Sequence, residues 1–321
     1  MKDINLKEIK KAYNRISELI NYTPIHNSRT LNQIVGSNIF LKCENFQRTG
    51  SFKFRGVINK LLQLEDRQKN RGIIAHSSGN HAQAVALASQ ILKIKSTIIM
   101  PKNAPKVKVK ATKGYGAKVV RCKNSIEDRE KTCKKIQEKH EYTLIHPYDD
   151  NEIIKGAGTA SMEMIDQIGE IKTFFCPIGG GGLISGNSTF LKELIKDIKI
   201  IGVEPKKADD AYRSLRDDRL YPSEYPDTIA DGLRTGLSHR TFKIIKENVD
   251  EIITVEEKEI IDAMKFLWNR MKIITEPSAA VSLAGLLKKS KKHEVGRKTG
   301  VLISGGNVDL KKFFKKYYKK I

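Results

Sequence analysis

The stretch TFFCPIGGGGLISG, residues 173–186, decides the fold class of this chain. It begins with a short apolar run typical of a buried strand, continues through four glycines, and leads into an apolar segment that predicts a helix beginning near Leu183. Similar short runs recur and alternate with longer segments of helical period. The other runs are GIIAHSS, STIIMP, AKVVRC, YTLIHP, IKIIGVEP, EIITV and GVLISGG. This alternation predicts an α/β protein with open, twisted, mostly parallel sheets and flanking helices.

Three of these predicted strands end in turns rich in glycine and serine. The turns are HSSGNHAQA (76–84), IGGGGLISG (178–186) and SGGNVD (304–309). Open α/β sheets bind ligands at the carboxyl ends of their strands. We therefore expect the three turns to face one crevice.

The four glycines at 179–182 are suited to binding an anion. Residues without side chains let several backbone N–H groups converge, and the start of the following helix adds partial positive charge. The stretch has neither a Walker lysine nor a GxGxxG motif followed by an acidic ribose ligand. A phosphate carried by something other than a dinucleotide is therefore the sharper interpretation, and a flexible turn is the alternative.

The segment SFKFRG, residues 51–56, contains Lys53 between Phe52 and Phe54. Apolar surroundings disfavour an ammonium ion, so Lys53 is a candidate amine nucleophile that could form a Schiff base. A surface lysine with a buried stem is the alternative. SSGNH, residues 77–81, is suited to binding a carboxylate or simply begins a helix, and Ser304 either faces an aromatic ring nitrogen or closes a strand.

The net charge of the 321-residue chain is +22, which raises the hypothesis of nucleic-acid binding. The lysines are spread over many helix-like stretches, so biased composition of solvated surfaces is the preferred explanation. The C-terminal DLKKFFKKYYKKI predicts an amphipathic helix. No apolar run approaches the roughly 20 residues that span a bilayer, and we expect a cytoplasmic protein. Its four cysteines form no CxxC motif and are expected to be reduced.

Six motifs together resemble fold-type II pyridoxal-phosphate enzymes, in particular the serine racemase and serine/threonine dehydratase group. They are ENFQRTGSFKFRG, HSSGNHAQA, IGGGGLISG, TIADG, RMKIITEPSAA and SGGNVD, and the resemblance runs from about residue 10 to residue 312. It implies a fold like that of the tryptophan synthase β subunit. The implied organisation is a large cofactor-binding domain (1–65 and 148–321), a small mobile domain (66–147) and a homodimer.

The resemblance also implies the roles of individual residues toward pyridoxal phosphate. Lys53 would carry the Schiff base, Phe52 would pack on the ring, and Ser304 would face the pyridine nitrogen. Asn80 would hydrogen-bond the phenolic oxygen. The phosphate would be bound by Gly179, Gly180, Gly181, Gly182 and Leu183, while Gly232 and Glu276 would line the cofactor pocket.

Two further sites are implied in the same way. VEPKKADD would supply Glu204, Ala208 and Asp210 to Mg²⁺, Ca²⁺ or Mn²⁺, where the residues alone indicate only an acidic helix start. An allosteric nucleotide such as ATP would contact Thr49, Gln83, Tyr115, Lys272 and Asn307, for which interface or pocket positions are the alternative.

The implied reaction is β-elimination of L-serine or L-threonine to pyruvate or 2-oxobutyrate and ammonia, together with racemisation of serine. Lys53 would act on one face of Cα and Ser78 on the other. The substrate would be bound by Ser77, Ser78, Asn80, His81 and Arg129, the last serving a second carboxylate. Ala82 departs from the glycine common in racemases. The alternatives are a threo-3-hydroxyaspartate dehydratase and a basic nucleic-acid-binding protein on an inactive enzyme scaffold.

Overall fold

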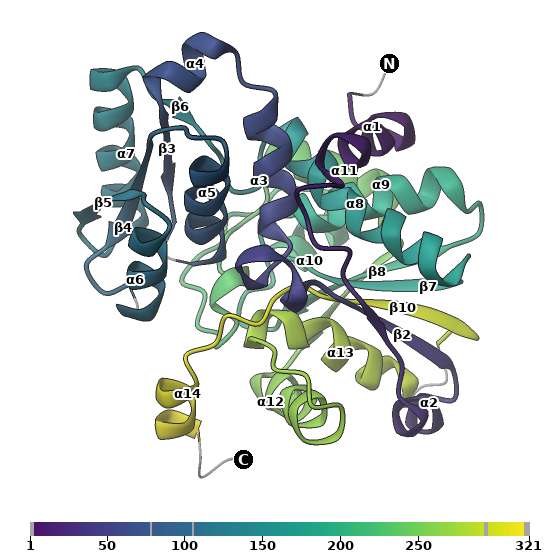
Figure 1. Ribbon diagram of the computed structural model, residues 1–321. Coiled ribbons are helices and arrows are strands. Elements are labelled where there is room, and N and C mark those ends of the chain that lie inside the picture. The colour runs from purple at the N-terminus through teal and green to yellow at the C-terminus, as the bar shows by residue number, and fades with distance from the viewer. Residues whose placement is uncertain (1–2, 78, 105, 292–294, 318–321) are drawn as a thin grey trace.

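The computed structural model describes residues 3–77, 79–104, 106–291 and 295–317. These residues form two β-sheets with helices packed around them, so the α/β prediction is confirmed (Figure 1). All eight predicted strands are present. Two strands were not predicted, namely β1 (Ile25–His26) and β2 (Asn38–Cys43).

The larger sheet has the strand order β1-β2-β10-β7-β8-β9. Its strands are parallel except for the short β1, which pairs with β2 in the antiparallel sense. Besides β1 and β2 it contains β7 (Thr173–Pro177), β8 (Lys199–Pro205), β9 (Glu251–Val255) and β10 (Lys298–Ile303). Because the strands run in one direction, the turns after β2, β7 and β10 lie along one edge of the sheet.

The smaller sheet is parallel throughout, in the order β5-β4-β3-β6. Its strands are β3 (Ile73–His76), β4 (Ser96–Pro101), β5 (Lys118–Cys122) and β6 (Thr143–Leu144). All four lie within the segment expected to form a small domain. The prediction that this segment, residues 66–147, moves as one unit stays a prediction.

The helices fill the connections between strands. They are α1 (Leu6–Ile16), α2 (Arg29–Val35), α3 (Lys53–Leu62), α4 (Asp66–Arg71), α5 (Asn80–Ile91), α6 (Lys106–Gly114), α7 (Ile126–His140), α8 (Asn151–Ile168), α9 (Gly182–Leu194), α10 (Asp210–Arg216), α11 (His239–Asn248), α12 (Glu257–Lys265), α13 (Pro277–Ser290) and α14 (Leu310–Tyr317). Short helical turns are η1 (Glu44–Phe46), η2 (Arg48–Gly50), η3 (Asp231–Leu233) and η4 (Phe266–Arg270).

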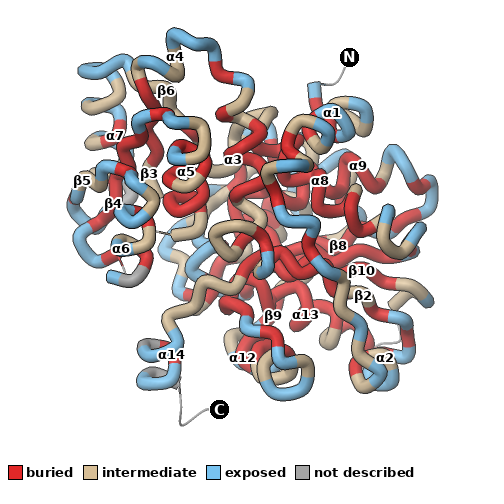
Figure 2. Tube along the Cα trace, viewed as in Figure 1, coloured by how far each residue is buried: buried red, intermediate tan, exposed pale blue. Residues whose placement is uncertain are grey.

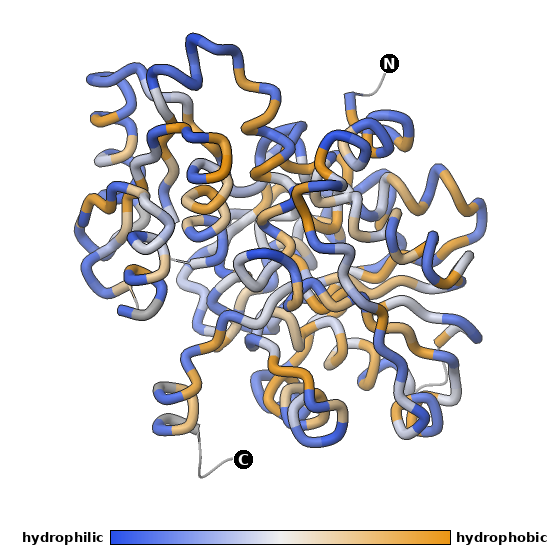
Figure 3. The backbone as a smooth tube through the Cα atoms, in the orientation of Figure 1, coloured by the Kyte–Doolittle hydropathy of each residue, from blue (hydrophilic) through white to orange (hydrophobic). Residues whose placement is uncertain are grey.

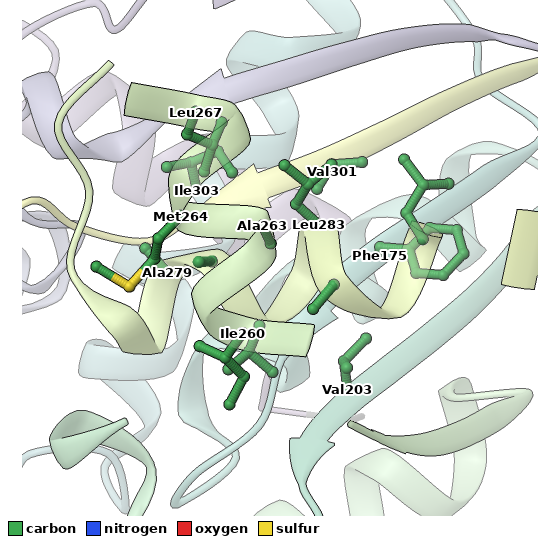
Figure 4. Close-up of a cluster of buried hydrophobic side chains, with 14 of the residues drawn as sticks. Phe175, Val203, Ile260, Ala263, Met264, Leu267, Ala279, Leu283, Val301 and Ile303 are labelled. Carbon is green, nitrogen blue, oxygen red and sulfur yellow. The ribbon is translucent and has the colours of Figure 1, made fainter. Parts of the chain in front are cut away.

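Alternate side chains of the larger sheet face opposite cores, as the two-residue period of a strand requires. On one face, Phe175 and Val301 join the buried cluster formed with α2, α12 and α13, part of which is drawn in Figure 4. On the other face, Phe174 and Leu302 join the cluster formed with α1, α8 and α9. Both faces are therefore covered, which explains the continuous apolar runs.

Helix α3 lies between the two sheets and contacts both α8 and α5 (Figure 1). A Cβ on Gly56 would lie 2.6 Å from the carbonyl oxygen of Ile153 in α8. The glycine thus allows the two helix backbones to approach closely. Figure 2 shows both helices buried in the centre of the molecule.

Hydrophilic segments cover the outer helices and loops, whereas hydrophobic segments concentrate in the interior strands (Figure 3). At the C-terminal end, α14 contacts the body through Phe313, whose ring centroid lies 5.3 Å from that of Trp268. The amphipathic terminal helix was therefore predicted correctly in its described part. None of the helices among the described residues is long and apolar enough to cross a membrane.

Candidate active site

A cavity of ≈ 420 Å³ lies where the carboxyl ends of strands from both sheets meet. Its walls include the residues that follow β3, β7 and β10, so the three glycine- and serine-rich turns face one crevice as expected. Nearly all of the predicted cofactor and substrate residues line it. These are Phe52, Lys53, Ser77, Asn80, His81, Arg129, Gly179, Gly180, Gly181, Gly182, Leu183, Gly232, Glu276 and Ser304. Ser78 lies outside the described residues.

Lys53 is the first residue of α3, and its ammonium group reaches into the cavity. Its Nζ donates a hydrogen bond to the carbonyl oxygen of Pro147 at 2.7 Å and lies 4.9 Å from the centroid of the Phe52 ring. Burial lowers the pKa of this ammonium to about 8, opposed by the nearby Glu276 carboxyl. About a tenth of the amine is therefore neutral at pH 7, far more than for an ordinary lysine with a pKa near 10.4.

The sequence predicted that Phe52 and Phe54 both surround Lys53 with apolar side chains, but the two rings lie in different clusters. Phe52 packs against the cluster on the α8 side, but Phe54 is fully buried in the separate cluster formed with α5. Consecutive residues of a helix point about 100° apart, so Lys53 and Phe54 cannot share one environment. The low pKa of Lys53 therefore arises from burial at the junction of the two sheets and not from both neighbours in sequence.

The glycine loop follows β7 and begins α9. Gly181 has φ +84°, a left-handed conformation that favours glycine. A Cβ on Gly180 would overlap the ring of Tyr148. Tyr148 therefore closes one side of the loop, and backbone N–H groups at the start of α9 remain suited to an anion.

A chain of hydrogen bonds runs from the cavity wall, formed here by Glu276 and Asn80, to Asn307 and Thr49. Asn80 Nδ2 donates to Glu276 Oε1 at 2.6 Å, while Asn307 Nδ2 donates to Asn80 Oδ1 at 3.0 Å and to the Thr49 carbonyl oxygen at 2.6 Å. Burial, reinforced by the charge of Asp231, raises the pKa of Glu276 to about 7. Glu276 can therefore carry or release a proton close to neutral pH.

Two of the predicted cofactor residues, Phe52 and Gly232, are held through hydrogen bonds from their backbone N–H groups. Phe52 N donates to the Ser304 carbonyl oxygen at 3.1 Å, and Gly232 N donates to Ser278 Oγ at 2.9 Å. The buried Ser304 thus lies directly beside the turn that carries Lys53. The residue directly after β10 therefore offers a hydroxyl to the cavity and not a carboxylate.

The side of the cavity formed by the smaller sheet is rich in nitrogen-containing side chains. His81 Nε2 donates to the Ile145 carbonyl oxygen at 2.9 Å, and burial holds the pKa of this imidazole well below its usual value. Arg129 reaches the cavity from α7, and its buried Nε has no hydrogen-bond partner among the described residues. Burial and the charge of Arg129 lower the pKa of His76 to about 4.

Sequence reasoning missed several cavity residues, including His76, Lys108, His146, Tyr148 and Asp231. Lys108 of α6 donates to Asp231 Oδ2 of η3 at 2.9 Å, which joins the two sheets across the cavity. His76 had a local signal, because it directly precedes a predicted ligand-binding turn. Asp231 lies in the TIADG motif and His146 ends a predicted strand run, whereas Lys108 and Tyr148 have no distinctive local pattern.

The predicted cation ligands lie where β8 leads into α10. Glu204 and Asp210 are buried, and burial raises the pKa of both carboxyls, that of Asp210 to about 6. Glu204 accepts backbone hydrogen bonds from Ala211 and Tyr212, at 3.2 and 2.7 Å, whereas Asp210 Oδ2 has no partner among the described residues. No group of three or more His, Cys, Asp or Glu side chains in the described chain is arranged to hold a metal.

The five predicted nucleotide contacts are spread over several elements. Thr49 and Asn307 are joined by the hydrogen bond described above. Gln83 is buried on α5, Tyr115 follows α6, and Lys272 follows η4 with φ +61°.

Comparison with known proteins decides the family. A model described as "Pyridoxal-phosphate dependent enzyme" matches residues 16–305. The chain belongs to this pyridoxal-phosphate enzyme family. The resemblance inferred from its motifs is therefore confirmed.

Relatives within the family are similar over nearly their whole length. A serine racemase of Dictyostelium discoideum is 45% identical over 313 residues, 97% of each chain. An L-threo-3-hydroxyaspartate ammonia-lyase of Saccharomyces cerevisiae is 45% identical over 307 residues, covering 95% of this chain and 94% of that one. The crystal structure of a serine racemase from Dictyostelium discoideum aligns with a TM-score of 0.91 and 45% sequence identity. The alignment covers 96% of this chain and 100% of that chain.

The cavity fits the cofactor of the pyridoxal-phosphate enzyme family. It combines a lysine of lowered pKa, a glycine loop whose backbone N–H groups suit a phosphate, and a volume large enough for a small ligand. The lysine and the glycine loop come from two separate stretches of chain and line the same cavity. Their convergence is what the family assignment requires of an active site.

Proposed function

We propose that the protein eliminates the β-hydroxyl of L-serine and L-threonine, forming pyruvate or 2-oxobutyrate and ammonia, and that it also racemises serine. The observation that carries the proposal is the meeting of Lys53, the glycine loop and Ser304 in one cavity. The similarity to a serine racemase and to an ammonia-lyase supports both arms of the proposal.

In this proposal, pyridoxal phosphate is held at both ends. Lys53 would bind it covalently, and the glycine loop with the start of α9 would bind its phosphate. Phe52, Asn80 and Ser304, which line the cavity, would hold its ring. Gly232 and Glu276 complete the pocket. When bound, the cofactor withdraws electrons from the substrate and weakens its Cα–H bond.

The protein residues would then control proton transfer. The Lys53 amine, with a pKa of about 8, would accept the Cα proton of the bound substrate. Ser77, Asn80 and the start of α5 bind the substrate carboxylate. Ser304 offers a hydroxyl and not a carboxylate, so it does not hold the pyridine nitrogen protonated. This favours loss of the β-hydroxyl over transamination.

The test is a product assay on L-serine, D-serine, L-threonine and threo-3-hydroxyaspartate, in which keto acid and inverted enantiomer are measured separately. We expect keto acid from L-serine and L-threonine and D-serine from L-serine. Failure to release keto acid from any of the four substrates would contradict the proposal.

A second candidate substrate, threo-3-hydroxyaspartate, is favoured by Arg129. Its guanidinium lines the cavity with a buried Nε that has no partner among the described residues, which suits a second carboxylate. The ammonia-lyase relative has this compound in its name. L-Serine and threo-3-hydroxyaspartate would undergo the same elimination. They differ in the second carboxylate, which only hydroxyaspartate could offer to Arg129.

Replacement of Arg129 by methionine is expected to separate these substrates. Loss of a charge-assisted hydrogen bond should lower kcat/KM for threo-3-hydroxyaspartate by about 10- to 100-fold. The value for L-serine, which has no second carboxylate, should change little. Lys135→Met, on the exposed side of the same helix, is the matched control. Equal losses for both substrates would contradict the role of Arg129 in selectivity.

We further propose that Glu204, Asp210 and the carbonyl oxygen of Ala208 hold Mg²⁺, with Ca²⁺ or Mn²⁺ as alternatives. Oxygen ligands suit these cations, and burial raises the pKa of both carboxyls, which means that their charged forms are poorly solvated. A cation would stabilise those charged forms and give Asp210 Oδ2 a partner.

Removal of the cation with a chelator is expected to lower both Tm and keto-acid production, because a ligand bound only to the native state stabilises it. Added Mg²⁺ should restore both. Asp210→Asn should be insensitive to the chelator, which provides the control. Unchanged Tm and activity, with no metal found by elemental analysis, would return the two carboxyls to a structural role.

The remaining proposals concern regulation and assembly. We propose a cytoplasmic homodimer in which residues 66–147 close over the substrate, with the Lys108–Asp231 ion pair as one contact that forms on closure. Allosteric binding of ATP through Thr49, Gln83, Tyr115, Lys272 and Asn307 is part of the same proposal. The hydrogen bonds from Thr49 through Asn307 to Asn80 would connect that region to the active site.

A further inference from the structure

Arg55, two residues after Lys53, is the centre of a fully buried network of charges. Its guanidinium donates two hydrogen bonds to the Glu44 carboxylate, at 2.7 and 2.8 Å, and two to the Glu163 carboxylate, also at 2.7 and 2.8 Å. Lys42 Nζ donates to Glu163 Oε2 at 2.7 Å. All four side chains have 0% exposure.

The network is complete in its hydrogen bonds. The remaining Arg55 contacts are the hydroxyls of Thr159 and Thr23, both at 3.3 Å. Lys42 also donates to the Thr23 carbonyl oxygen at 2.8 Å and to Gln167 Oε1 at 3.0 Å. Full pairing is what a buried group of charges requires, because an unpaired member would be strongly destabilising.

The turn that carries Lys53 has no capping side chain of its own. Phe52 occupies the N-cap position of α3 and makes no side-chain cap hydrogen bond. On one side, Phe52 N donates to the Ser304 carbonyl oxygen after β10. On the other side, Arg55 binds Glu44, which directly follows β2. Because β2 and β10 are adjacent, with Cys43 opposite Ile303, the first turn of α3 is held to the ends of two neighbouring strands.

Arg55 also connects this turn to α8. Glu163 lies on α8, and the segment just before that helix contains Pro147, whose carbonyl oxygen accepts the hydrogen bond from Lys53 Nζ. The guanidinium therefore binds the strand end and the helix that together determine where Lys53 sits relative to Pro147. A planar fork can bind two carboxylates in this way, whereas a lysine ammonium cannot.

The network carries no net charge, because Lys42 and Arg55 offset Glu44 and Glu163. It therefore exerts little electrostatic influence on the Lys53 amine, and any effect on that amine must come from geometry. This distinguishes Arg55 from a residue that tunes a pKa.

We infer that Arg55 is a positioning residue for the active-site lysine, and that its two carboxylate partners hold the first turn of α3 so that Lys53 Nζ reaches the reacting atoms. The inference rests on the proposed role of Lys53. A misplacement of about 1 Å can cost about 100-fold in rate even when the chemical groups are unchanged.

The test compares Arg55→Lys, which keeps the charge and loses the fork, with the parent holoenzyme. We expect kcat to fall by about 10- to 100-fold with KM little changed. The pH midpoint of kcat should stay where it is. Independently of turnover, stripped Arg55→Lys protein mixed with pyridoxal phosphate should develop the yellow absorption of the covalent bond more slowly than the parent.

Lys42→Met is the matched control, since it disrupts the same network but leaves all four Arg55–carboxylate hydrogen bonds. It should lower Tm by an amount similar to Arg55→Lys, with kcat and the rate of covalent attachment close to those of the parent. If both variants lose stability and both keep the parent kcat, the network is structural only and the inference is wrong. A shifted pH midpoint in Arg55→Lys, which keeps the network neutral, would show that the network acts by charge, which also overturns the inference.

Glu163→Gln provides a second route if Arg55→Lys does not fold. It removes the carboxylate on α8, keeps the fork on Glu44, and should show the same loss in kcat and attachment rate. A Glu163→Gln enzyme with parental values of both would contradict the inference. Lys53→Ala measured in parallel separates the two hypotheses, because its retention of activity would end the proposed function itself, whereas a normal Arg55→Lys enzyme would end only this inference.

Discussion

Lys53→Ala is expected to lower turnover of every substrate by more than about 10⁴-fold, since one substitution removes both the covalent bond to the cofactor and a general base that by itself contributes about 10²- to 10⁴-fold. The variant should still bind pyridoxal phosphate through the glycine loop but should lack the yellow absorption of the covalent form. Turnover and absorption spectra of the purified protein measure both effects.

The matched control is Lys60→Ala on the same helix. Lys60 Nζ lies 2.8 Å from Asp150 Oδ2, and Lys60 does not line the cavity. Its loss should therefore leave turnover and absorption unchanged.

The rate at which pyridoxal phosphate attaches to the parent protein stripped of cofactor should rise with pH toward about 8. The pKa of Lys53 is lowered to that value, and only the neutral amine reacts. A Lys53→Ala enzyme with near-parental turnover would refute the proposed mechanism.

Ser78→Ala is expected to abolish racemisation while much of the elimination from L-serine remains. The Lys53 amine is proposed to act on one face of Cα, so inversion needs a second group that delivers a proton to the other face. Ser78 is proposed for that role from its motif. Both neighbours, Ser77 and Gly79, line the cavity. Elimination from D-serine would begin with Ser78 as base and should be lost together with racemisation.

Chiral analysis of serine, run beside the keto-acid assay, measures these effects. Ser77→Ala is the control, because Ser77 Oγ accepts a hydrogen bond from Gly79 N at 3.2 Å and is proposed to bind the substrate without moving a proton. That variant should raise KM for both enantiomers and keep inversion. Racemisation that survives in Ser78→Ala would mean that another residue is the second acid, and a parent enzyme that forms no D-serine would be a dehydratase alone.

Much of the active site could be predicted from short stretches of sequence. The glycine loop, the SSGNH turn and Ser304 each follow an apolar run that is buried in any parallel sheet, and the carboxyl ends of such strands share one edge. The local pattern therefore predicts both the strands and the convergence of the turns. The same logic failed for β2, because its run NIFLKC contains Lys42, and lysine is almost never fully buried unless it is paired.

The burial of charged side chains, unlike the position of the turns, could not be predicted from short stretches of sequence. Arg55, Glu44 and Glu163 read as ordinary surface residues in the sequence, yet they are buried and bound to one another. Arg55 and Glu163 lie 108 positions apart, so no local pattern could connect them. The same holds for Lys108 and Asp231, which meet across the cavity from the two sheets.

The sequence by itself determined the class of fold, the strands that are apolar throughout, and the loops suited to an anion and a carboxylate. Those features depend on hydrophobicity and backbone freedom, which act over a few neighbouring residues. Only the tertiary structure decided which charged side chains are buried and why Lys53 has a pKa of about 8. Desolvation and ion pairing depend on partners from distant parts of the chain, so they exist only after the chain has folded.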